Sequence, residues 1–231
     1  MDLQLKGNNA VITGGSKGIG RAIAEALASE GCNVAICARN QAEIDAAVTS
    51  LASKGVKAIG ASVDVMDGDA LKGWIAAAGE ELGGIDCLVS NVSGGNAPGE
   101  EGWRASCEGD ILGAVRCVEA ATPMLEKSAN ASIVMISSTA ALEKFIGPSA
   151  YNAMKAALLN YSGALAQELG PKGIRVNAIS PGPIMIEGGA WDNIKQHMTP
   201  FYEATVAEIP VGRMGTAEEV AAQITLLASP L

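Results

Sequence analysis

The sequence predicts an α/β domain in which helices cover both faces of a doubly wound parallel sheet. Three observations support this fold class: strand-like and helix-like segments alternate, the strand-like segments are almost continuously apolar, and a glycine-rich turn follows the first of them. The chain has 231 residues and is 48% hydrophobic, which is enough to bury such a sheet as one unit. We therefore expect a single domain over residues 1–231.

Six short segments rich in Val, Ile and Ala are the predicted strands. Their continuous apolar character is typical of strands that are buried on both faces. They are residues 9–14, 33–38, 57–65, 86–91, 131–137 and 175–180. Segments with polar flanks and helical spacing separate them, which implies right-handed crossovers between parallel strands. These predicted helices cover residues 20–31, 40–55, 69–83, about 101–127 and 149–170.

Two connections differ from the short loops that this layout prefers. Residues 92–100 are glycine-rich and follow the fourth predicted strand, so they lie at the carboxyl edge where such sheets bind ligands. Residues 181–210 are too long for a simple connection. We expect a lid over the same edge, at about 183–210.

The charge and hydropathy of the chain exclude several classes of partner. The net charge is −9, the pI is about 4.7, and no cluster of Lys or Arg is present, so nucleic acid and anionic membrane are disfavoured. No apolar run reaches the roughly 20 residues of a membrane span, and the first residues lack the pattern of a secretory signal. We expect a cytoplasmic protein that acts on a small molecule.

The cysteines and the histidine offer no familiar metal site. The cysteines are odd in number, lack C-x-x-C spacing and mostly lie in apolar segments, so we expect reduced core residues. They are Cys32, Cys37, Cys87, Cys107 and Cys117. His197 is the one histidine, and a Ser-His-Asp hydrolase would depend entirely on it. We therefore expect no metal, and hydrolysis is disfavoured.

The glycine-rich turn predicts a nucleotide site. Gly14 permits a tight turn, and Gly18 and Gly20 let a pyrophosphate approach the N-terminus of the following helix. Simple turn chemistry is the alternative, which the strand-turn-helix context disfavours. The candidate cofactor contacts of this turn are Gly14, Ser16, Lys17, Gly18, Ile19 and Gly20.

The end of the second predicted strand favours NADP(H) over NAD(H). An acidic residue usually binds a free ribose at this place, but Arg39 and Asn40 stand there, and Lys17 lies in the glycine turn. Two cations without a carboxylate favour a 2′-phosphate. The alternative is that Arg39 and Lys17 are solvated surface charges.

Two later strand ends supply further candidate cofactor contacts. Asp64 and Val65 follow the third strand and are placed to meet adenine, and Asn91 follows the fourth and is placed to meet ribose. The alternative for Asp64 is to cap the helix that starts near Asp67.

Tyr151 and Lys155 are the central candidates for chemistry. Four residues make about one helical turn, so both side chains project from the same helix face. A nearby cation favours the phenolate and lowers the tyrosine pKa from about 10, which would make the phenol a usable acid or base. The alternative is a tyrosine in the core beside a lysine in water. Ser138 precedes the tyrosine and carries a third candidate group.

Together these motifs resemble the short-chain dehydrogenase/reductase family over the whole chain. The matching stretches are TGGSKGIG, NVSG, Ser138, YNAMK and PGPI, in the family's order. The resemblance implies a Rossmann-like, NADP(H)-dependent oxidoreductase that interconverts a ketone and a secondary alcohol, similar to 3-oxoacyl carrier-protein reductases. It implies that Tyr151 donates or accepts the proton, that Lys155 lowers its pKa and binds the nicotinamide ribose, and that Ser138 hydrogen-bonds the reacting oxygen. It also implies cofactor contacts at Tyr151, Lys155, Pro181, Gly182 and Ile184.

One departure from the family pattern affects the expected chemistry. Asp110 stands where the family generally has an asparagine that holds a water in the proton relay to the lysine. A carboxylate can accept that hydrogen bond, but its charge stabilises Lys155 as a cation and partly cancels its effect on Tyr151. We expect Asp110 to take part in catalysis with slower or pH-shifted turnover. The alternative is an aspartate on a helix surface.

The C-terminal region departs as well. Family members continue past LLASPL with a seventh strand, so we expect the sixth strand to be a sheet edge and part of the tetramer surface to be missing. Pairing through the helices near 101–127 and 149–170 still predicts a homodimer or homotetramer. The alternative function is a nucleotide-binding member with weak or lost catalysis that acts as a regulatory or partner subunit.

A mostly apolar substrate pocket is expected beside the tyrosine. Its predicted wall is Glu143, Phe145, Ile146, Met185, Ile186 and Trp191. The alternative for these side chains is to pack the lid on the body of the domain.

Overall fold

The computed structural model describes residues 2–143 and 147–231. Within them lies a six-stranded sheet with the order β3-β2-β1-β4-β5-β6, and every neighbouring pair is parallel. The strands are β1 (Asn9–Thr13), β2 (Asn33–Ala38), β3 (Ala58–Ser62), β4 (Cys87–Ser90), β5 (Ser132–Ile136) and β6 (Arg175–Ile179). Each falls inside a predicted strand, so the doubly wound fold class is confirmed.

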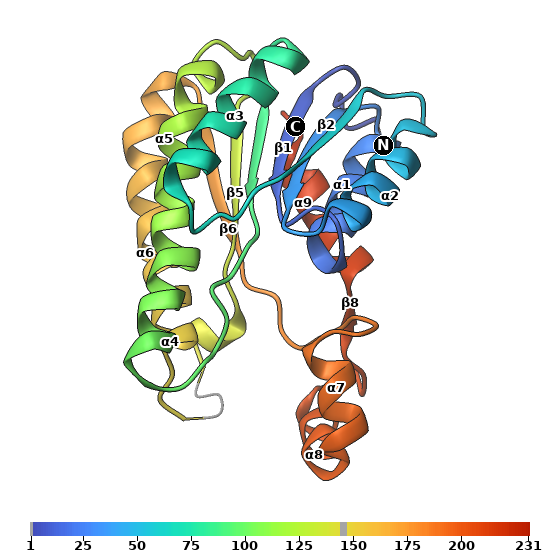
Figure 1. Cartoon of the computed structure of the whole chain (residues 1–231), viewed down its shortest axis with the longest axis vertical. Helices are drawn as coiled ribbons and strands as arrows, with labels where there is room; N and C mark the ends of the chain where they lie inside the picture. The colour runs from blue at the N-terminus through green and yellow to red at the C-terminus, as the bar shows by residue number, and fades with distance from the viewer. Residues whose placement is uncertain (1, 144–146) are drawn as a thin grey trace.

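Helices cover both faces of the sheet (Figure 1). One face carries α1 (Gly18–Ser29), α2 (Gln41–Ala52) and α9 (Ala217–Ala228), and the other carries α3 (Gly68–Leu82), α5 (Gly113–Leu125) and α6 (Ala150–Leu169). All of them except α9 overlap predicted helical segments, and α1 and α3 begin two residues and one residue before the predicted start. The helix α9 was not expected, although it begins with a capping box between Thr216 and Glu219.

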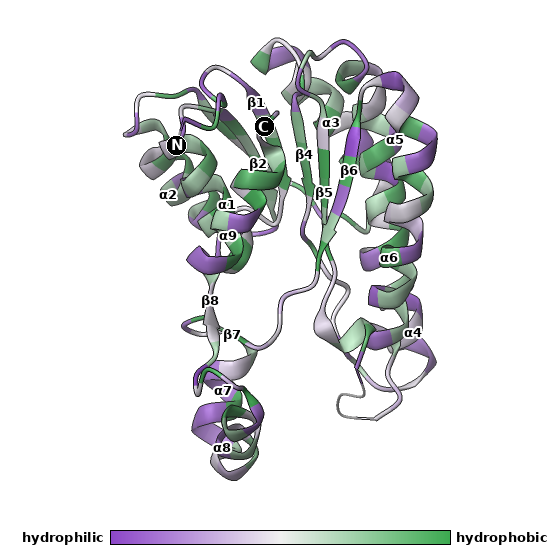
Figure 2. Ribbon diagram, turned by 180° about the vertical axis from the view of Figure 1, so that it is seen from behind, coloured by the Kyte–Doolittle hydropathy of each residue, from purple (hydrophilic) through white to green (hydrophobic). Residues whose placement is uncertain are grey.

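The core lies on the two faces of the central strands. All five residues of β1 are buried, and alternate residues enter different clusters. Ala10 and Ile12 pack with residues of α1, α2 and α9, whereas Val11 packs with residues of α3, α5 and α6. Figure 2 shows the hydrophobic residues gathered on the sheet and on the helix faces turned towards it. Burial on both faces explains the continuous apolar runs in the sequence.

The predicted helix near 101–127 is divided into three parts. α4 (Gly99–Ser106) is followed by a π-helical segment, η1 (Cys107–Leu112), and then by α5. Gly109 packs directly on the loop after β4, since a Cβ there would lie 2.7 Å from the Cα of Gly94. A π turn inserts one extra residue and re-aims the side chains around it, and such turns are frequent at functional sites. Here the buried residue that it presents is Asp110.

The long connection after β6 forms a projecting arm. It contains β7 (Ile184–Met185), α7 (Ala190–His197) and α8 (Thr199–Glu208), and β7 pairs in parallel with β8 (Gly215–Thr216). Neither α7 nor α8 has a buried residue. Trp191 stacks on Phe201 with 6.1 Å between ring centroids. Figures 1 and 2 show both helices extending beyond the sheet, at the same end of the molecule as α4 but on the opposite side.

The sheet edge and the cysteines agree with the sequence predictions. β6 is the last strand in the sheet order, and all five of its residues are partly exposed. Four of the cysteines are buried and Cys107 is partly buried, and all five are free thiols. Burial raises the pKa of Cys32 and of Cys37 to about 12, so these thiols behave as core groups. In the described part of the chain, no helix is long and apolar enough to cross a membrane.

Candidate active site

The glycine turn after β1 forms a cradle at the N-terminus of α1. Gly14 and Gly18 have φ values of 68° and 58°, in the left-handed region that favours glycine. A Cβ on Gly20 would lie 2.2 Å from the Gly14 carbonyl oxygen, so only glycine fits there. The helix begins at Gly18, and the Lys17 side chain makes no capping hydrogen bond. The first backbone N–H groups of α1 are therefore available to an anion, and the cradle fits a pyrophosphate.

A cavity of about 560 Å³ lies beside this turn, within the usual size of a small-molecule site. It is formed at the ends of β1, β2, β3 and β4 and reaches Gly109 of η1. The predicted cofactor residues that line it are Gly14, Ser16, Lys17, Arg39, Asn40, Asp64, Val65 and Asn91. The predicted contacts that do not line it are Gly18, Ile19, Gly20, Tyr151, Lys155, Pro181, Gly182 and Ile184. The cavity thus fits the adenosine half of a dinucleotide.

Two polar residues around this cavity also hold the backbone. The Asn91 amide donates to the Thr13 carbonyl oxygen at 3.0 Å, which fixes the start of the glycine turn against β4. Asn40 caps α2 by accepting from the backbone N–H of Glu43 at 3.3 Å. The capping alternative for Asp64 is wrong, because Asp67 is the residue that caps α3.

Glu43 is a residue of this cavity that the sequence reasoning missed. Its carboxylate accepts a hydrogen bond from Ser16 Oγ at 3.1 Å, and Lys17 Nζ lies 3.5 Å from its other oxygen. The expectation that this cavity has cations and no carboxylate is therefore wrong, because Glu43, in the first turn of α2, also lines it. The signal was present in the sequence: Asn40 and Glu43 have the spacing of an N-cap and its N3 residue.

Ser138, Tyr151 and Lys155 come together at the end of β5. Ser138 follows this strand, and its Oγ accepts from the Ala140 backbone N–H at 3.2 Å. Tyr151 and Lys155 lie on α6, with Lys155 Nζ 5.7 Å from the centroid of the Tyr151 ring. A hydrogen bond with the Ser138 hydroxyl acts to lower the pKa of Tyr151. The alternative of a lysine in water is wrong, because Lys155 is only 2% exposed.

The Lys155 ammonium is held by a carboxylate and a carbonyl group. Nζ lies 2.9 Å from Asp110 Oδ1 and donates to the Ile136 carbonyl oxygen at 2.8 Å. The other carboxylate oxygen, Oδ2, accepts from the Gly94 N–H at 3.0 Å and from Ser93 Oγ at 3.2 Å. Asp110 is 1% exposed, so the alternative of a surface aspartate is wrong.

The pKa of Tyr151 departs from the expected direction. Burial raises it above the usual value of 10, the negative charge of Asp110 raises it further, and the Ser138 hydrogen bond opposes both effects. The Tyr-Lys spacing predicted a lowered pKa. The physical reasons for the difference are first the burial of the phenol and then the negative charge of Asp110, which also forms the ion pair with Lys155.

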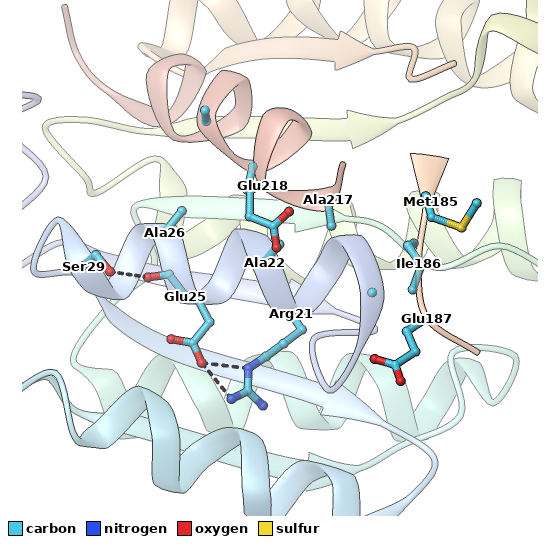
Figure 3. Close-up of a pocket in the computed structure, with 13 residues that line it drawn as sticks. Arg21, Ala22, Glu25, Ala26, Ser29, Met185, Ile186, Glu187, Ala217 and Glu218 are labelled. Carbon is cyan, nitrogen blue, oxygen red and sulfur yellow. Dashed lines mark hydrogen bonds and ion pairs between the residues drawn. The ribbon is translucent and has the colours of Figure 1, made fainter. Parts of the chain in front are cut away.

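Of the described residues in the predicted substrate wall, only two line a common cavity. Met185 and Ile186 line a second cavity, of about 580 Å³, together with residues of α1 and α9 (Figure 3). On its α1 side, Arg21 forms an ion pair with Glu25 at 2.7 Å. Trp191 lies in the projecting arm, and Glu143 is exposed. Phe145 and Ile146 lie outside the described residues.

The glycine cradle, the adenosine-sized cavity and the Ser-Tyr-Lys group lie at the carboxyl edge of one parallel sheet. The model of the family described as Enoyl-(Acyl carrier protein) reductase matches residues 14–231. This chain belongs to the short-chain dehydrogenase/reductase family. The family resemblance of the sequence is thereby confirmed, and with it the assignment to enzymes that act on CH–OH and C=O groups.

Three similar proteins support this assignment to the family. The isoepoxydon dehydrogenase patN of Penicillium expansum is 41% identical, over 98% of this chain and 90% of that protein. The structure of L-sorbose reductase from Gluconobacter frateurii with NADPH and L-sorbose matches with a TM-score of 0.90 at 30% identity, over 99% of this chain and 92% of that chain. The structure of 7α-hydroxysteroid dehydrogenase with NADH and 7-oxo glycochenodeoxycholic acid has the same TM-score and identity, over 99% of this chain and 90% of that chain.

Proposed function

We propose that this protein is an NADP(H)-dependent oxidoreductase that reduces a ketone to a secondary alcohol, or catalyses the reverse reaction. The observation that carries the proposal is the grouping of Ser138, Tyr151 and buried Lys155 at the carboxyl end of β5, on the same sheet edge as the glycine cradle. Hydride delivery to a ketone leaves negative charge on its oxygen, which needs a hydrogen-bond donor and a proton source. Ser138 and Tyr151 supply these two groups.

The cofactor residues support NADP(H). Lys17 and Arg39 line the adenosine-sized cavity, and a 2′-phosphate is the anion that such a pair favours. The similar L-sorbose reductase binds NADPH, although the similar 7α-hydroxysteroid dehydrogenase binds NADH. The bound nicotinamide would supply the hydride. The chain's own residues would bind the dinucleotide, place the ketone and move the proton.

In this proposal Tyr151 is the group that exchanges the proton. Its raised pKa keeps the phenol protonated at neutral pH, so it is a donor for reduction. The single O–H of Ser138 would donate to the developing oxyanion. Lys155 has three N–H donors, and one of them bonds to the Ile136 carbonyl oxygen, which leaves a donor for the nicotinamide ribose beside the Asp110 ion pair.

Asp110 would take the place of the relay asparagine that the family resemblance implies. Its Oδ1 is an ion-pair partner of Lys155, but no described residue gives this buried oxygen a hydrogen bond. Buried polar atoms normally have such a partner. A water of the proton relay would satisfy it, while Oδ2 stays fixed to the loop at Gly94.

The proposal has a direct test in the oxidation of NADPH with a panel of ketones that includes β-ketoacyl thioesters. We expect turnover by the native protein and a loss of at least about 100-fold in kcat for Tyr151→Phe, because general acid catalysis is removed. The matched control is Tyr161→Phe, a partly buried tyrosine farther along the same helix, which should keep its activity. Equal activity of the two variants would reject the role of Tyr151.

The second candidate is a nucleotide-binding protein with weak catalysis that acts as a regulatory or partner subunit. The buried Asp110–Lys155 ion pair favours it, because the pair balances the lysine charge on which the phenol depends. The same panel separates the two candidates. Tight NADPH binding without turnover of any ketone would support this second function.

We also propose that residues 1–231 act as one domain, with 183–210 as a lid over the carboxyl edge. The position of the α7–α8 arm beyond the sheet supports this role. A cytoplasmic homodimer or homotetramer is proposed as well. Free buried thiols support a reducing compartment, and Trp103 and Leu112, which are 46% and 37% exposed on α4 and η1, support an assembly surface there.

A further inference from the structure

Glu43 lies among the cations that would bind the ribose end of the cofactor. Ser16 Oγ donates to Glu43 Oε2 at 3.1 Å, and Lys17 Nζ is 3.5 Å from Oε1. All three residues line the 560 Å³ cavity, together with Arg39. Ser16 and Lys17, two of the donors nearest the expected 2′-phosphate, therefore already interact with the Glu43 carboxylate.

The three partners differ in how firmly they are held. Ser16 is 8% exposed and lies in the glycine turn, so its hydroxyl has little freedom to leave this place. The Lys17 side chain is 78% exposed and that of Glu43 is 36% exposed, so their ion pair is open to water and to exchange with a ligand. The Arg39 guanidinium has no carboxylate partner among the described residues and remains available.

Charge then decides how each nucleotide meets this site. Lys17 and Arg39 contribute two positive charges to this cavity, and Glu43 and Asp64 contribute two negative charges, so the lining offers no net positive charge to a phosphate of about −1.5 to −2. A 2′-phosphate must share Ser16 and Lys17 with the carboxylate and lies close to a like charge. A free 2′-hydroxyl instead finds in Glu43 an acceptor for its hydrogen bond.

We propose that Glu43 is a specificity-determining residue that weakens the preference of this site for NADP(H) over NAD(H). The proposal rests on the proposed cofactor function and goes beyond it, because it assigns to one carboxylate a measurable share of nucleotide choice. Glu43 acts as a built-in competitor of the 2′-phosphate and as a partner for the unphosphorylated ribose.

The test compares dissociation constants of NADPH and NADH, measured by nicotinamide fluorescence, in the full chain and in Glu43→Gln. The glutamine keeps the size of the side chain, an oxygen acceptor for Ser16, and the backbone N–H that Asn40 caps. Removing a negative charge near the phosphate should tighten NADPH binding about three- to tenfold at low salt. NADH binding should stay equal or weaken.

Asp45→Asn is the matched control, because it makes the same change of charge on α2 at an exposed position that accepts from Gln41 at 2.7 Å. This variant should change neither dissociation constant by more than about twofold, as expected for a solvent-exposed charge that does not line the cavity. In Lys17→Met, NADPH should bind more weakly and NADH should not. Adding Glu43→Gln to that variant should then give a smaller gain than in the native chain, because the two residues share one ion pair.

The outcomes separate the inference from the function on which it rests. If the native chain binds both nucleotides and Glu43→Gln leaves their ratio unchanged, the competitor role is rejected while the oxidoreductase proposal stands. If Glu43→Gln weakens NADPH binding, Glu43 positions Lys17 for the phosphate and the inference is reversed. If the native chain binds neither nucleotide, the proposed function fails and this inference fails with it.

Discussion

The Lys155 ammonium lies 2.9 Å from the Asp110 carboxylate, and both side chains are almost completely buried. Removing an ion pair of this kind from water is costly, and the attraction repays the cost only when other polar contacts complete it. The Ile136 carbonyl oxygen accepts a hydrogen bond from the lysine, and Ser93 and Gly94 donate hydrogen bonds to the carboxylate. One carboxylate thus connects the loop after β4, which borders the cofactor cavity, to the lysine of the proposed catalytic group.

Replacing Asp110 with asparagine should move the pH profile to lower pH. The Asp110 charge raises the pKa of Tyr151, so its removal lowers that pKa. Alcohol oxidation needs the phenolate and should begin at lower pH, and ketone reduction needs the neutral phenol and should be lost at lower pH. Profiles of kcat/KM in both directions measure the shift, with Glu101→Gln on the exposed side of α4 as the control. An unmoved profile, or one that moves to higher pH, would contradict this electrostatic role.

Lys155→Met should destabilise the fold more than the double variant Lys155→Met/Asp110→Asn. The single change leaves a buried carboxylate without its counter-ion, which costs about 3–5 kcal/mol of unfolding free energy. The double variant removes that charge and keeps an oxygen acceptor for Gly94. Urea unfolding of the native chain, both single variants and the double variant gives the coupling. Additive losses would show that the pair does not act as a unit.

Gly20→Ala should abolish nucleotide binding and destabilise the fold. The new Cβ would lie 2.2 Å from the Gly14 carbonyl oxygen, so the turn must move. Gly163→Ala is the matched control, because this exposed glycine inside α6 has open space around it. We expect it to stabilise the helix by about 0.5–1 kcal/mol. Thermal unfolding and NADPH titration test both changes, and an intact nucleotide site in Gly20→Ala would refute the close-approach argument.

Glu219 should titrate at unusually low pH. The hydrogen bond with Arg213, aided by the Thr216 backbone N–H, lowers the pKa of this carboxyl to about 2. Its contribution to stability is therefore complete above the ordinary value near 4.5 and is lost as the pH falls towards 2. Side-chain NMR titration measures the midpoint. In Arg213→Gln the midpoint should rise towards 4.5, and an unchanged midpoint would assign the shift to another cause.

The sheet could be predicted from the sequence because burial on both faces requires a continuous apolar run in each strand. Each strand is a short apolar run between polar segments, and the chain repeats this pattern in a regular order. The π turn at η1 could not be predicted in this way, since no sequence pattern separated it from the α-helices on either side. The close approach of Gly109 in this turn to Gly94 forms only after the loop docks on the helix.

The candidate site was predictable where one element carries the pattern. Tyr151 and Lys155 share one helix, so their common face follows from spacing alone. The neighbours of Lys155 were harder to predict, because Asp110 and Ile136 come from other elements and contact it only in the packed fold. The same holds for Glu43, whose entry into the cavity depends on how α2 sits against the end of β2.

The α7–α8 arm has a consequence for engineering. Because neither helix contributes a buried residue, the layered body does not depend on their sequence for its stability. A library randomised over these two helices would therefore lose few members to misfolding. Under the proposed lid role, selection on such a library would report substrate preference without the loss of folded protein that accompanies mutation of a core.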